Sequence, residues 1–183
     1  MNLTLPNLLS LLRMGLIPLF VIAVLDGRPG RALLVFAIAG VTDALDGFIA
    51  RFWNQRSELG AYLDPAADKL LLVTAYVVLA IPNLQREFVI PAWVTALVIT
   101  RDVVIVVVAL ILYLASGVTR FPPSPISKIN TAVQVATVIV VLLAGVVNGL
   151  DLVATVAVYL VAALTLGSGI DYIRLANKMA AES

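Results

Sequence analysis

Four aspartates gathered in one stretch of an otherwise apolar chain constrain most strongly what this protein can fold into. They are Asp43, Asp46, Asp64 and Asp68, in a chain where only 11 of 183 residues are acidic and 62% are hydrophobic. Asp43 and Asp46 are three residues apart, so on a helix they lie on one face. Asp64 and Asp68 are four residues apart and likewise share a face. Two neighbouring helices would therefore bring four carboxylates to one point.

A divalent cation removes the repulsion among these carboxylates. Without a counterion the four groups would repel one another, and some would take up protons. Oxygen ligands without thiol or imidazole suit Mg²⁺, Mn²⁺ or Ca²⁺. The chain has no His and no Cys, which disfavours a zinc site of the usual kind. We therefore expect a hard divalent cation, Mg²⁺, Mn²⁺ or Ca²⁺, at this point.

Small residues flank both acidic pairs, so no bulky side chain projects from these parts of the helix surface. Gly47 and Ala50 follow the first pair, and Gly60 precedes the second. A bulky ligand or another backbone can approach such a face closely. Arg51 also lies beside the first pair, and its planar guanidinium suits phosphate. Together these features indicate a site for a metal-bound di- or polyphosphate.

Long apolar runs make up most of the chain, with a mean hydropathy of +1.07. They predict an all-α integral membrane protein in which residues 1–183 form a single membrane domain. The six expected transmembrane helices cover about residues 6–25, 31–52, 60–81, 89–115, 129–147 and 152–172. Segments rich in Gly, Pro or polar residues separate the helices. They are predicted to be a turn at 26–30, polar connections at 53–58 and 82–87, a loop at 116–127 and a turn at 148–151.

The distribution of charge predicts an orientation in the membrane. Six spans place both termini on one side, and cations on that side outnumber those on the other by six to three. The positive-inside rule then puts the termini in the cytoplasm, and the metal site between helices 2 and 3 near the cytoplasmic face. The N-terminus lacks a basic region and a cleavage site, so it is interpreted as a mature start. We expect a bacterial inner (cell) membrane protein, and the net charge of +1 gives no bulk attraction to nucleic acid.

Polar residues in other spans are candidates for binding phosphate or an acceptor. Arg13 either extends to the membrane interface or faces the site and binds phosphate. Arg101 either forms a self-neutralising pair with Asp102 or holds a phosphate or lipid headgroup, and the second interpretation is favoured. Asn7 and Lys128 are further candidates. The polar side chains at 130, 131 and 134 either line the same cavity or bond to a neighbouring helix.

The acidic pattern resembles that of a known enzyme family. The CDP-alcohol phosphotransferases carry the pattern Asp-x-x-Asp-Gly-x-x-Ala-Arg, then eight residues, then Gly-x-x-x-Asp-x-x-x-Asp. Residues 6–13 are also similar to a common N-terminal segment of that family. All eight fixed positions match: Asp43, Asp46, Gly47, Ala50, Arg51, Gly60, Asp64 and Asp68. The resemblance implies transfer of a substituted phosphate from a CDP-linked donor to an alcohol, with release of CMP.

The same resemblance implies roles for individual residues. The four aspartates would hold one or two metal ions, Mg²⁺ or Mn²⁺, over the donor pyrophosphate, and Asp68 would also act as the general base. The residues that would bind the CDP-linked donor are Asp46, Gly47, Ala50, Arg51 and Gly60. CDP-diacylglycerol is the expected donor, because a membrane domain with no soluble part suits a lipid substrate.

Two acceptors remain open. Four stretches are similar to the corresponding parts of family members that make cardiolipin from phosphatidylglycerol: residues 54–60, residues 63–69, residues 126–134 and the pair Arg101-Asp102. Members that make phosphatidylglycerophosphate from glycerol 3-phosphate tend to carry a second Arg further along that helix, whereas residues 103–112 contain no cation. A doubly charged phosphate would favour such a partner. Phosphatidylglycerol is therefore favoured over glycerol 3-phosphate.

Other classes of protein fit the pattern less well. Intramembrane Asp and Arg also mark ion pathways, so a small ion transporter is an alternative. A carrier would distribute its acids through the membrane depth, whereas here they cluster at one end of two adjacent spans. Chance ion pairs between helices, or a purely structural membrane subunit, would not account for eight matched positions. The sequence specifies no oligomeric state, and a homodimer remains open.

Overall fold

The computed structural model describes residues 5–52, 58–82, 89–116 and 125–182, and these residues form six helices. The helices are α1 (Leu5–Leu25), α2 (Pro29–Phe52), α3 (Glu58–Leu79), α4 (Ala92–Ser116), α5 (Pro125–Ala144) and α6 (Asp151–Glu182). The predicted all-α class is confirmed. Some side chains within these helices lie outside the description, namely those of residues 5–7, 46–52, 58–63, 173, 175–182 and most of 109–116. The connections expected within 53–57 and 83–87 also lie outside it.

Several helix boundaries differ from those predicted. Helix α5 begins at Pro125, inside the segment 116–127 that was predicted to be loop. The loop was therefore predicted to extend too far, since residues 125–127 are helical. Proline is well suited to the first position of a helix, because a backbone N–H at that position would have no acceptor within the helix. Helix α6 continues to Glu182, beyond the predicted end at 172. Residues 173–182 contain no Gly or Pro and are rich in good helix formers, so nothing in them ends the helix.

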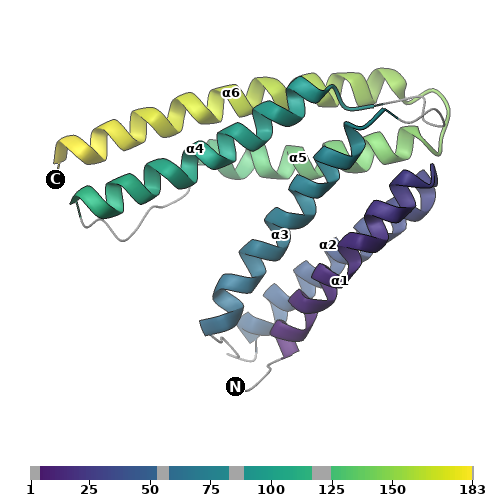
Figure 1. The fold of residues 1–183 in the computed structure, drawn as a ribbon, viewed down its shortest axis with the longest axis horizontal. Helices are drawn as coiled ribbons and strands as arrows, with labels where there is room; N and C mark the ends of the chain where they lie inside the picture. The colour runs from purple at the N-terminus through teal and green to yellow at the C-terminus, as the bar shows by residue number, and fades with distance from the viewer. Residues whose placement is uncertain (1–4, 53–57, 83–88, 117–124, 183) are drawn as a thin grey trace.

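The helices form two groups of three (Figure 1). Helix α1 packs along α2 and α3, and helix α6 packs along α4 and α5. The groups meet chiefly where α2 packs against α5, and they diverge from that junction toward the two chain ends. At the junction a Cβ added to Gly145 would lie 2.8 Å from the Cβ of Pro29, so glycine allows α5 to end against the start of α2.

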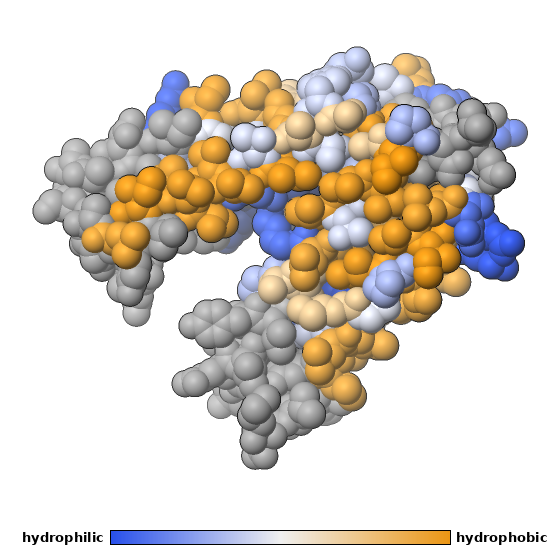
Figure 2. Space-filling view, in the orientation of Figure 1, coloured by the Kyte–Doolittle hydropathy of each residue, from blue (hydrophilic) through white to orange (hydrophobic). Residues whose placement is uncertain are grey.

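Apolar side chains cover much of the outer surface (Figure 2). Three helical segments among the described residues are long and apolar enough to cross a membrane, namely Leu8–Leu25, Pro125–Ala144 and Asp151–Tyr172. Large apolar side chains such as Leu19, Leu114 and Leu152 are more than half exposed. Contiguous apolar surface of this kind is unfavourable in water and favourable in a lipid bilayer. The fold is therefore that of a membrane protein.

Several polar and charged side chains are buried inside the molecule. Buried polar or charged residues include Ser10 and Arg13 of α1, Arg101 of α4 and Ser168 of α6. Figure 2 also shows hydrophilic side chains in the recess between the two helix groups. A buried charge is costly unless it is paired and hydrogen-bonded. The partners of these buried cations therefore locate the polar centre of the molecule.

Candidate active site

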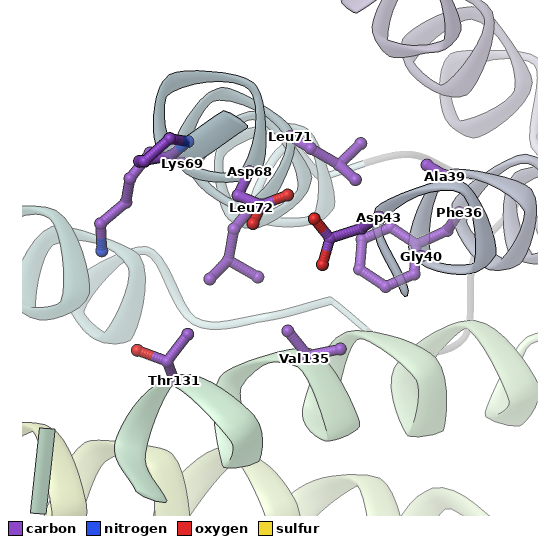
Figure 3. Close-up of a pocket in the computed structure, with 11 residues that line it drawn as sticks. Phe36, Ala39, Gly40, Asp43, Asp68, Lys69, Leu71, Leu72, Thr131 and Val135 are labelled. Atoms are coloured by element: carbon purple, nitrogen blue, oxygen red, sulfur yellow. The ribbon is translucent and has the colours of Figure 1, made fainter. Parts of the chain in front are cut away.

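A cavity of about 470 Å³ lies between α2, α3 and α5. Its lining residues are Phe36, Ala39, Gly40 and Asp43 from α2, Pro65, Asp68, Lys69, Leu71 and Leu72 from α3, and Thr131 and Val135 from α5. Figure 3 shows the carboxylates of Asp43 and Asp68 pointing toward one another from the two helices. The cavity therefore joins a charged region to a largely apolar wall.

Arg13 of α1 connects the two facing carboxylates. Its Nη2 lies 2.9 Å from Oδ1 of Asp43, and its Nη1 donates to Oδ1 of Asp68 at 2.5 Å. The arginine side chain is fully buried, whereas those of Asp43 and Asp68 are 44% and 49% exposed. One guanidinium thus bridges an acid of α2 and an acid of α3, as its planar fork permits.

Asp64 has a partner on the same helix as Arg13. The hydroxyl of Ser10, a fully buried residue, donates to Oδ1 of Asp64. Ser10 and Arg13 are three residues apart and share a face of α1. Three of the four motif acids therefore bond to one face of the first helix. The side chains of Asp46, Gly47, Ala50, Arg51 and Gly60 lie outside the description, although α2 and α3 carry these residues.

The described acids suit a hard divalent cation by their donor chemistry. No three acidic side chains in the described part of the chain gather closely enough to enclose a metal ion. Asp43 and Asp68 both present oxygens to the cavity, and Asp64 is directed to Ser10. Mg²⁺ is usually held by one or two carboxylates together with water and substrate phosphates, without a cage made of protein alone. Two facing carboxylates fit that arrangement.

A second polar network extends from the cavity into α4, α5 and α6. The ammonium of Lys69, at the cavity wall, pairs with Asp102 of α4. Arg101 donates to the same carboxylate at 2.8 Å and to the hydroxyl of Ser127 at 2.6 Å. Its Nε donates to the hydroxyl of Ser168 at 3.2 Å. This network links four helices and crosses between the two helix groups.

The candidate acceptor residues differ in accessibility. Arg101 is 7% exposed and donates hydrogen bonds to the side chains of Asp102, Ser127 and Ser168. It therefore faces the interior of the second helix group, which consists of α4, α5 and α6. Lys128 is exposed and lines a more open hollow of about 430 Å³ at the start of α5. That hollow shares Thr131 and Val135 with the main cavity. The side chain of Asn7 lies outside the description.

The polar residues at the start of α5 divide between the two predicted roles. Thr131 lines the cavity, whereas Asn130 is buried and accepts a hydrogen bond from Thr165 of α6. Sequence reasoning did not single out Ser10, although a serine one turn before a membrane-embedded arginine was a usable signal. It also gave no role of its own to Lys69, whose position next to Asp68 places it at the cavity.

Comparison with known proteins gives the family. Residues 3–167 match the model of the CDP-alcohol phosphatidyltransferases. The chain belongs to this family, whose members generally use divalent metals. The eight motif positions and the two facing acids agree with that membership.

Individual relatives are more specific. The chain is 41% identical to the human cardiolipin synthase (CMP-forming), in an alignment that covers 81% of this chain and 53% of the human protein. It is 37% identical to the cardiolipin synthase (CMP-forming) of Streptomyces coelicolor over 71% of this chain and 59% of that protein. It is 34% identical to the CDP-diacylglycerol–glycerol-3-phosphate 3-phosphatidyltransferase of Haemophilus influenzae, over 97% of this chain and 95% of that protein. The chain thus spans little more than half of the cardiolipin synthases it matches.

Proposed function

We propose that this protein transfers the phosphatidyl group of CDP-diacylglycerol to phosphatidylglycerol, forming cardiolipin and releasing CMP. The observation that carries the proposal is the pair of carboxylates, Asp43 and Asp68, facing one cavity from two helices. The same cavity has an apolar wall that includes Phe36, Leu72 and Val135. Such a site combines oxygen ligands for a metal-bound pyrophosphate with apolar surface for a lipid.

The proposed reaction is a displacement at phosphorus. The acceptor hydroxyl attacks the phosphorus that carries the diacylglycerol group, and a new P–O bond forms as the P–O bond to CMP breaks. The hydroxyl proton passes to the carboxylate of Asp68, and CMP leaves with the electron pair. Asp68 is the proposed base because it faces the cavity and the chain contains no His. Bound Mg²⁺ or Mn²⁺ would neutralise the pyrophosphate and the leaving group.

The remaining motif residues complete the proposed donor site. Asp43, Asp46, Asp64 and Asp68 would hold one or two metal ions. The cytidine end of the donor would lie against Gly47, Ala50 and Gly60, with Arg51 on a phosphate. These assignments follow the match of the motif position by position.

The acceptor is proposed to enter from the side of α5. Lys128 is an exposed cation in the hollow that adjoins the main cavity, and it suits the phosphate of phosphatidylglycerol. Lys69 lines the main cavity and is half exposed. Arg101 is fully engaged with Asp102, Ser127 and Ser168, so its proposed role is to anchor Asp102. Asn7 stays a candidate from the sequence alone.

A second candidate is phosphatidylglycerophosphate synthesis from glycerol 3-phosphate. The observation that favours it is the similarity to the Haemophilus influenzae protein along almost the whole of both chains. Its charged acceptor would use the same exposed lysine. A small ion transporter is the alternative from another class, and it would release no CMP.

The proposed setting is a bacterial inner membrane, with six transmembrane helices and with the termini and the metal site on the cytoplasmic side. The apolar outer surface supports burial in a bilayer, and the excess of cations on one side supports the orientation. A homodimer is compatible with this arrangement.

The test is a paired assay on purified protein in liposomes with CDP-diacylglycerol and Mg²⁺ or Mn²⁺. Either phosphatidylglycerol or glycerol 3-phosphate is added, and CMP and the lipid product are measured for each. Cardiolipin formation would support the proposal, and phosphatidylglycerophosphate formation would support the second candidate instead. CMP release in neither reaction would contradict both.

A pair of variants tests the base in the same assay. Asp68→Asn should lower turnover by roughly 100- to 10,000-fold, the usual contribution of a general base. Asp26→Asn is the matched control, because Asp26 is exposed in the turn after α1 and does not line the cavity. Turnover of Asp68→Asn equal to that of the control would remove the base assignment.

A further inference from the structure

We infer that Ser10 and Arg13 of α1 are positioning residues that set the geometry of the metal ligands on α2 and α3. The inference rests on the proposed metal site. Neither residue belongs to the acidic motif, and both lie on α1, which carries none of the four proposed metal ligands. Their role would be to hold three carboxylates from two other helices in one arrangement.

The first observation is the placement of Arg13. The guanidinium bridges Asp43 and Asp68 through different nitrogens, at 2.9 Å and 2.5 Å. Each acid is held in a fixed orientation relative to the other, although they come from different helices. A lysine ammonium keeps the charge but is a compact donor without the planar fork, so it cannot reproduce this two-pronged geometry.

The second observation is that Ser10 extends the same contact surface. Its hydroxyl bonds to Asp64 from a position one turn before Arg13. Both residues are 0% exposed, in contrast to the large apolar side chains of Leu8 and Leu12 on the same helix. The polar face of this part of α1 is therefore directed at the acids, whereas the neighbouring Leu8, Leu11 and Leu12 face outward.

The location of these two residues separates positioning from substrate binding. Neither Ser10 nor Arg13 lines the cavity, whereas Asp43 and Asp68 do. A substrate phosphate in the cavity would meet the carboxylates, and the fully buried arginine lies behind them. Arg13 would thus act through the acids and not through direct contact with the substrate.

Electrostatics allow this arrangement to coexist with a metal ion. Two carboxylates and one guanidinium carry a net charge of −1, so the group still attracts a divalent cation after Arg13 is counted. Each carboxylate has a second oxygen and further lone pairs beyond those that accept from the arginine. Outer hydrogen-bond partners of metal-ligating carboxylates commonly change metal affinity by roughly 10- to 100-fold when they are removed.

The test measures metal binding without substrates. Purified protein in detergent is titrated with Mn²⁺, and free Mn²⁺ is measured by its electron paramagnetic resonance signal. The variants are Ser10→Ala and Arg13→Lys. Matched controls are Thr155→Ala, whose hydroxyl bonds only within α6, and Arg31→Lys, an exposed cation on α2. Thermal unfolding in excess chelator reports whether each variant is folded.

We expect the Mn²⁺ dissociation constant to rise roughly 10- to 100-fold in Arg13→Lys, and by a smaller factor in Ser10→Ala. Both variants should unfold cooperatively in chelator, and both controls should bind as the wild type does. Dissociation constants within twofold of wild type in both variants would overturn the inference, even if their melting temperatures fall. Tighter binding in Arg13→Lys would also overturn it, because the guanidinium would then be a competitor of the metal.

The wild-type titration separates this inference from the function it rests on. Saturable Mn²⁺ binding by the wild type, with unchanged variants, would overturn the positioning role alone. An absence of saturable binding by the wild type would overturn the proposed metal site and the positioning role together. Partial recovery of the transfer rate of Arg13→Lys at high Mn²⁺ would further support a role in ligand geometry.

Discussion

Replacing Arg101 by methionine should destabilise the protein more than it weakens substrate binding. The guanidinium is buried in the second helix group and donates to Asp102, Ser127 and Ser168. Methionine has a similar length and is apolar, so the substitution removes the charge and the donors with little loss of volume. The carboxylate of Asp102 is 11% exposed, and Lys69 would be its one remaining partner among the side chains that the structure describes.

The magnitude follows from these contacts. Removing one member of a buried ion pair costs roughly 3–5 kcal/mol. Lys69 still neutralises Asp102, so the lower end, about 3 kcal/mol, applies here. The two serine hydroxyls lose their charged donor and add about 1 kcal/mol, since each can reorient toward a backbone carbonyl. A total of about 4 kcal/mol corresponds to a melting temperature lower by roughly 8–16 °C for a chain of this size.

The assay is thermal unfolding in detergent with Arg31→Met as the control. Arg31 is exposed, so its replacement should change stability by no more than about 0.5 kcal/mol. The transfer assay, run well below the melting temperature, should show similar KM values for donor and acceptor in Arg101→Met and wild type. Unchanged stability together with a raised KM for the acceptor would refute the anchoring role and restore the headgroup-binding interpretation of the sequence.

Three further changes test other parts of the structure. Chelating divalent metal should stop CMP release, and adding Mg²⁺ or Mn²⁺ back should restore it; full activity in excess chelator would rule out a metal requirement. Lys128→Ala should raise the acceptor KM about fivefold, equivalent to about 1 kcal/mol for an exposed charge, and leave the donor KM within roughly twofold; equal changes in both would move Lys128 out of the acceptor site. Gly145→Ala should destabilise the protein by about 1–3 kcal/mol, because its Cβ would lie 2.8 Å from Pro29, and the matched control Gly167→Ala meets nothing within 4 Å. Equal melting temperatures for the two alanine variants would argue against close packing of α2 on α5.

Local patterns in the sequence were sufficient for the helices and for the acidic motif. Apolar runs separated by Gly and Pro predicted six helices, because helix formation depends on residues within a few turns of each other. The spacing of Asp43 with Asp46 and of Asp64 with Asp68 predicted that α2 and α3 would carry the acids. Helix ends were less accurate, as at Pro125, because the same proline can end a loop or begin a helix.

Only the tertiary structure decided which side chains meet. Arg13 bonds to Asp68 across 55 residues of chain, Ser10 to Asp64 across 54, and Arg101 to Ser168 across 67. The hydrophobic periodicity of the sequence does not predict such pairings, because they depend on how whole helices pack against one another. The sequence alone could not tell whether a membrane-embedded arginine binds a substrate phosphate or a carboxylate of the protein itself. That choice is made by the packing of α1 against α2 and α3 and of α4 against α6, which places each guanidinium beside the acids or hydroxyls that offset its burial.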